Sequence, residues 1–107
     1  MDDWETKFNK NEFSWNKEAN MLYIESPAGV GYSFCDNIKL CASSDASSSI
    51  DNLEALLSFF EKFPMFLGND LYLSGESYAG VYVPYLAIRI HEYNSWVKRE
   101  ITPSILL

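Results

Sequence analysis

The stretch "NDLYLSGESYAG", residues 69–80, joins a short apolar run to a group of small residues around Ser77. Its "LYLS", residues 71–74, has the length and composition of a buried strand. Apolar residues then recur at helical spacing, which predicts a helix from about residue 78 to residue 93. These apolar positions are Val83, Leu86 and Ile90. The stretch therefore predicts a strand that turns sharply into a helix at Ser77.

Small side chains flank Ser77 on both sides. Gly75 stands two positions before it and Ala79 two positions after it, with Gly80 next. A serine on a sharp strand-to-helix turn needs small neighbours so that strand and helix can pass, as in the nucleophile elbow G-x-S-x-G. The match is partial, because Ala79 takes the place of the second glycine. From these residues alone, a serine that merely caps the helix remains an equal alternative.

A second strand and helix are predicted upstream. "MLYIE", residues 21–25, is an apolar run closed by the turn-forming "SPAGVG". Ser48 and Asp51 have capping-box spacing at the start of a helix predicted over residues 49–62. Its apolar positions include Ile50, Leu53, Leu57 and Phe60. The order strand, helix, strand, helix predicts an α/β fold in which residues 21–25 and 71–74 pair in parallel.

Pro84 lies inside the second predicted helix. A proline there removes one backbone hydrogen bond and crowds the carbonyl of Gly80, four residues earlier. We therefore expect a bend, or a regular helix that begins only near Pro84.

Length, charge and composition exclude several classes. A chain of 107 residues makes at most one domain. The net charge of -7 argues against a nucleic-acid or anionic-membrane surface, because both need clustered Lys and Arg. No apolar run approaches the roughly 20 residues that span a bilayer, and the charged start "MDDWETKFNK" is unlike a signal peptide. A metal site is not expected, since His91 is the only histidine.

Two longer segments carry a family resemblance. "FSWNKEANMLYIESPAGVGYSF" and "FFEKFPMFLGNDLYLSGESYAGVYVPYLAIRI" resemble the serine carboxypeptidases, which are α/β-hydrolase-fold exopeptidases of lysosomes, vacuoles and secretions. The resemblance implies a partial domain of this kind over residues 1–94, with a divergent C-terminal tail over residues 95–107. It also implies peptide or protein C-termini as substrates, a lysosomal, vacuolar or secreted location, and no cofactor.

The resemblance assigns roles to three neighbouring residues. Ser77 is implied to be the acylating nucleophile, and the amide of Tyr78 one donor of the oxyanion hole. Glu76 is implied to face the C-terminal carboxylate of the substrate. Because two carboxylates in contact repel unless they share a proton, such an enzyme is expected to work in acid.

The cysteines Cys35 and Cys41 lie in "CDNIKLC". Their spacing alone permits a small disulfide loop or two unrelated thiols. Some members of the family carry a cysteine pair in this loop, so the resemblance favours a disulfide.

A general base for Ser77 is not evident in the chain. Fourteen helical residues at about 1.5 Å each place His91 roughly 20 Å away, far beyond hydrogen-bond reach. The Asp and His of the family lie downstream, and its "GGPG" segment upstream, of what this sequence contains. We therefore expect an inactive fragment that lacks parts of its own domain. A carboxypeptidase-like acyltransferase and a non-catalytic peptide- or partner-binding fragment are the alternatives.

Overall fold

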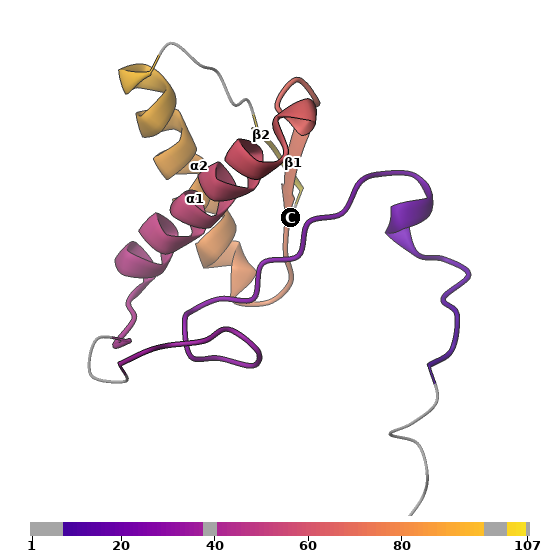
Figure 1. Cartoon of the computed structure of the whole chain (residues 1–107), viewed down its shortest axis with the longest axis horizontal. Helices are drawn as coiled ribbons and strands as arrows, with labels where there is room; N and C mark the ends of the chain where they lie inside the picture. Colours follow the sequence, from indigo (N-terminus) through magenta and orange to yellow (C-terminus); the bar gives the residue numbers. More distant parts are fainter. Residues whose placement is uncertain (1–7, 38–40, 98–102, 107) are drawn as a thin grey trace, which may run out of the picture.

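The computed structural model describes residues 8–37, 41–97 and 103–106. Its regular elements along the chain are η2 (Trp15–Lys17), α1 (Asp45–Lys62), η3 (Pro64–Phe66), β1 (Leu71–Ser74), α2 (Ala79–Trp96) and β2 (Pro103–Leu106). In Figure 1 the indigo and purple segment that precedes α1 is an irregular trace apart from the short η2 helix. The regular structure is thus concentrated after residue 44.

Helix α1 begins four residues earlier than predicted, at Asp45 instead of residue 49. Ser44 has extended backbone angles and caps the helix, since its side chain accepts a hydrogen bond from the amide of Ser47 at 3.2 Å. The side chain of Ser47 in turn accepts from the amide of Ser44 at 2.8 Å. The predicted capping box at Ser48 is therefore wrong. In a run of serines the cap falls where the backbone leaves the extended conformation, and Ser48 is already helical and buried.

The sheet consists of β1 and β2, which pair in parallel with Leu71 opposite Pro103 and Ser74 opposite Leu106. Helix α2 connects them, so β1, α2 and β2 form the parallel strand–helix–strand unit. The predicted strand at residues 21–25 is not formed, and its predicted pairing with β1 is wrong. An apolar run becomes a strand only where it finds a partner, and Tyr23 in this run is 78% exposed.

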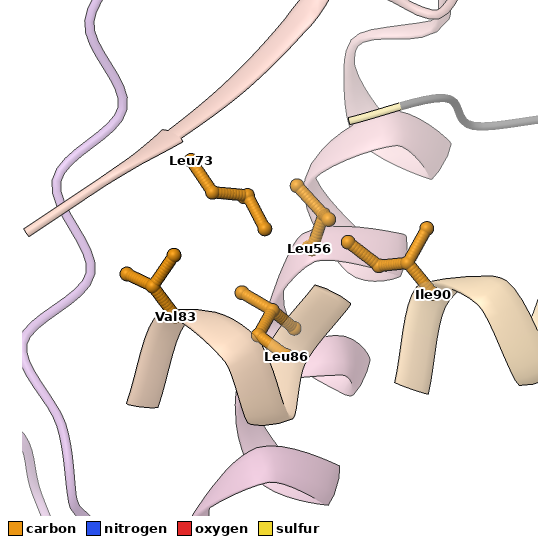
Figure 2. Packing of buried hydrophobic residues seen from close by; sticks show 5 residues of the cluster. All are labelled: Leu56, Leu73, Val83, Leu86 and Ile90. Atoms are coloured by element: carbon orange, nitrogen blue, oxygen red, sulfur yellow. The ribbon is translucent and has the colours of Figure 1, made fainter. Parts of the chain in front are cut away.

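A small core lies between β1 and the two helices, as Figure 2 shows. Its buried side chains are Leu56 of α1, Leu73 of β1, and Val83, Leu86 and Ile90 of α2. The three α2 residues are those that the helical spacing predicted. Ile50 of α1, also assigned to the apolar face, is instead 48% exposed. This core fixes the end of β1 against the start of α2.

Helix α2 runs without interruption through Pro84, from Ala79 to Trp96. The prediction that the regular helix begins only near Pro84 is therefore wrong, because the helix already begins at Ala79. Val83 and Leu86 are buried on either side of the proline, so tertiary packing holds the helix where its backbone bonding is weakest.

Candidate functional site

Ser77 lies in the turn between β1 and α2, and its backbone is left-handed with φ of 58°. Only Ser77 among the described non-glycine residues has a positive φ. Three consecutive amides then wind the turn into the helix: Ala79 donates to Glu76, Gly80 to Ser77, and Val81 to Tyr78, at 3.1, 3.0 and 2.9 Å. A non-glycine residue held in this conformation stores about 1–3 kcal/mol of strain, which the surrounding structure must offset.

The close approach of strand and helix explains the glycine at position 75. A Cβ there would lie 2.3 Å from the Cβ of Ala79 and 3.2 Å from Cγ2 of Val83. The small residues at 75 and 79 therefore touch across the turn, as the spacing argument required. Gly80 differs, because a Cβ at that position would meet no atom of the structure within 4 Å.

The side chains of Glu76, Ser77 and Tyr78 are exposed together at the carboxyl end of β1. Ligands of open α/β sheets bind at this end of the strands. Among the described residues, the amide of Tyr78 has no hydrogen-bond acceptor. The turn thus carries an exposed hydroxyl, an exposed carboxylate and an amide donor with no acceptor among the described residues, all within three consecutive positions.

The Tyr78 ring is tied to helix α1. Its hydroxyl donates to both carboxylate oxygens of Asp45, at 3.2 and 3.1 Å, across 33 positions of sequence. The hydrogen bond to Asp45 and the negative charge of Asp45 raise the pKa of Tyr78 above its ordinary value of 10.0. Tyr82, one turn along α2, contacts the same ring edge to face at 5.0 Å between centroids. Asp45 was not among the predicted site residues, because its position in the first turn of a helix is its only local signal.

Glu25 organises the loop that follows residues 21–25. Its carboxylate accepts the amide of Tyr32 at 2.6 Å, and its carbonyl accepts the hydroxyl of Ser33. Gly31 has φ of 56°, and a Cβ there would lie 1.8 Å from Oε1 of Glu25. The left-handed backbone conformation favours glycine at this position, and the glycine also leaves room for the Glu25 carboxylate. Glu25 was not among the predicted site residues, although the "GVG" segment that it contacts was predicted to be a turn.

Cys35 and Cys41 form a disulfide with their Cα atoms 6.4 Å apart. This distance lies within the usual range for the bond. The bridge closes the loop that leads from the "GVG" turn to helix α1.

His91 is exposed in the second half of α2, on the helix that begins beside Ser77. In the parts of the chain that the structure describes, no group of three or more His, Cys, Asp or Glu side chains could bind a metal ion. None of the described helices has both the length and the apolar character needed to cross a bilayer.

Comparison with known proteins identifies the family of the chain that carries this turn. A family model described as serine carboxypeptidase matches residues 1–105. Serine carboxypeptidase ctsa-4.1 of Caenorhabditis elegans is 56% identical over 80 residues, which cover 75% of this chain and 17% of that protein. Serine carboxypeptidase 24 of Arabidopsis thaliana is 49% identical over 85 residues, covering 78% and 18%.

The Lysosomal protective protein of Mus musculus is 50% identical over 80 residues, which cover 75% of this chain and 17% of that protein. This chain thus spans less than a fifth of the length of these relatives. The parallel β1–β2 pair and its helices are compatible with part of an α/β-hydrolase fold. By sequence, the chain belongs to the serine carboxypeptidase family.

Proposed function

We propose that this chain is the nucleophile-bearing part of a serine-type carboxypeptidase, which releases C-terminal residues from peptides through an acyl-enzyme on Ser77. The observation that carries the proposal is the left-handed Ser77 at the end of β1, within "GESYAG" of a serine carboxypeptidase family member. A strained, exposed serine between strand and helix is the geometry of a nucleophile elbow.

The chemistry follows from the turn. The Oγ of Ser77 attacks the carbonyl carbon of the last peptide bond, and the carbonyl oxygen becomes an oxyanion. The free amide of Tyr78 donates a hydrogen bond to that oxyanion, which is usually among the largest catalytic contributions. A general base takes the Oγ proton during the attack and passes it to the leaving nitrogen as the carbonyl re-forms and the C–N bond breaks. The C-terminal residue thus leaves as an amine, and water later hydrolyses the acyl-serine.

Glu76 supplies substrate selection in this proposal. It lies exposed beside Ser77, on the same turn. A carboxyl group that carries a proton donates a hydrogen bond to the free carboxylate of a peptide end, whereas two charged carboxylates repel. Exopeptidase action in acid, as in a lysosome, a vacuole or an acidic secretion, is consistent with this pairing.

The general base is proposed to come from outside residues 8–97. His91 lies in the second half of α2. The helical rise of about 1.5 Å per residue places it too far from the Oγ of Ser77 for a hydrogen bond. The isolated chain is therefore proposed to be inactive until the remaining parts of an α/β-hydrolase domain surround it.

A hybrid enzyme tests the proposal. The 85 matched residues of this chain replace their counterparts in Serine carboxypeptidase 24 of Arabidopsis thaliana, to which they are 49% identical. We expect the hybrid to release C-terminal residues from peptides, and Ser77→Ala to abolish that release. Ser74→Ala is the matched control, since Ser74 is an exposed serine at the end of the same strand.

Two outcomes speak against the proposal. Full peptidase activity in Ser77→Ala would remove the serine from catalysis. Acyl transfer to an added alcohol or amine without peptide hydrolysis would assign the chain to an acyltransferase instead.

A further inference from the structure

We propose that Asp45 is a positioning residue for the oxyanion hole: through its hydrogen bond to the Tyr78 hydroxyl, it holds the residue whose amide receives the oxyanion. The inference rests on the proposed function and adds a residue to it from a different helix. Asp45 touches neither the substrate nor the reacting atoms, and it acts only through Tyr78.

Asp45 is well placed to hold a side chain still. It is the first residue of α1, directly after the Ser44 cap. Helix α1 is joined to α2 by the buried Leu56 in the shared core, and by Arg89, whose Nε donates to Oγ of Ser49 at 3.1 Å. The carboxylate of Asp45 therefore sits on a helix that is itself fixed to α2, the helix that Tyr78 precedes.

Tyr78 needs such a support. Its neighbour Ser77 is in a left-handed conformation that persists only when its surroundings hold it. On the strand side, Gly75 and Ala79 are in contact across the turn. On the helix side, Tyr78 as a residue is 55% exposed, and its ring contacts the ring of Tyr82 edge to face. Without Asp45 the phenol hydroxyl loses its fixed partner among the described residues.

The arrangement separates two possible roles of the carboxylate. An acidic residue in the first turn also favours the helix dipole of α1, whatever Tyr78 does. Asp45→Asn keeps an oxygen acceptor for the Tyr78 hydroxyl and removes the charge, whereas Asp45→Ala removes both. A positioning role predicts that the amide variant retains most of the activity that alanine loses.

The test measures kcat and KM of the hybrid enzyme for one peptide, with active sites titrated by a fluorophosphonate so that only folded enzyme is counted. We expect Asp45→Ala to lower kcat about tenfold, a fraction of the loss seen when an oxyanion donor is removed outright. KM should change less than about twofold, because the interaction is made in the transition state. Asp45→Asn should stay within about threefold of the parent.

A double-mutant cycle supplies the second measurement. If Asp45 acts through the Tyr78 hydroxyl, Tyr78→Phe should match Asp45→Ala, and the double variant should lose no more than either alone. Asp51→Ala is the matched control, because Asp51 is an exposed acid on the same helix. Asp51→Ala should leave kcat equal to that of the unsubstituted hybrid enzyme.

Parental kcat in Asp45→Ala, or additive losses in the double variant, would overturn the inference. These results are distinct from failure of the proposed function. If Ser77→Ala abolishes turnover while Asp45→Ala does not reduce it, only the positioning role falls. If Ser77→Ala leaves turnover intact, the proposed function falls first and this inference falls with it.

Discussion

Gly75 and Ala79 are in contact across the turn that carries Ser77, so closely that a Cβ on residue 75 would lie 2.3 Å from the Cβ of Ala79. Real Cβ atoms essentially never approach one another so closely. The contact joins the end of β1 to the first residue of α2. A glycine at position 75 therefore allows strand and helix to approach closely enough for Ser77 to adopt its left-handed conformation between them.

Gly75→Ala should destabilise the hybrid enzyme. The new methyl group meets Ala79 and Val83, which have no flexible end to move aside. Overpacking of this kind typically lowers the free energy of unfolding by about 1–3 kcal/mol. Urea unfolding measures this change, and Gly80→Ala is the control, since that position is open and helical. Equal stability of the two variants would show that the turn is not as tight as described.

The pKa of Tyr78 gives a prediction at alkaline pH. Asp45 raises this pKa, so the folded state holds the phenol proton more tightly than the unfolded state does. The contribution to stability is complete below pH 10 and is lost as the pH rises through the raised value. Asp45→Ala removes both the hydrogen-bond acceptor and the charge, so it should move the pKa of Tyr78 back toward 10.0. Ultraviolet titration of the hybrid enzyme measures the change, with Tyr78→Phe identifying the signal. An unchanged titration in Asp45→Ala would contradict the hydrogen bond.

Local patterns predicted the elements next to the site. The strand at residues 71–74 has the predicted bounds, and the helical spacing of Val83, Leu86 and Ile90 identified core residues of α2. These signals are short-range, because the apolar pattern of a strand or of a helix face lies within a few consecutive turns or residues of sequence. The family followed from the "GESYAG" and "SPAGVG" blocks.

Long-range relationships could not be predicted in the same way. The parallel partner of β1 is β2, which lies after α2, and no local pattern distinguishes it from the apolar run at residues 21–25. The tie between Asp45 and Tyr78 spans 33 positions and appears only when α1 and α2 pack together. The helix start at Ser44 was missed because neighbouring serines offer equivalent caps.

Glu76→Gln should change the pH dependence of the hybrid enzyme. An amide donates a hydrogen bond to the substrate carboxylate without first taking up a proton. The decline of kcat/KM between acid and neutral pH should therefore become shallower in the variant. The profile is measured with one peptide across the range, because other ionising groups shape it as well. An unchanged profile would remove Glu76 from carboxylate binding.

The 107-residue chain by itself should associate in solution or unfold without cooperativity. Its accessible surface is 9178 Å², compared with about 6,100 Å² for a compact monomer of its 12.3 kDa mass. Its radius of gyration is 16.0 Å, compared with about 13 Å for a compact domain. Large apolar side chains are exposed, including Phe13 at 89% and Phe34 at 82%. A monodisperse monomer with a cooperative thermal transition, by ultracentrifugation and calorimetry, would be the opposite result.

The central claim is that Ser77 is the nucleophile, and covalent labelling tests it most directly. The hybrid enzyme is treated with a fluorophosphonate and digested, and the labelled residue is located by mass spectrometry. We predict the label on Ser77, at a rate that parallels loss of peptidase activity, and none at this position in the isolated 107-residue chain above a Ser77→Ala control. A label on another residue, together with full peptidase activity in Ser77→Ala, would contradict the claim.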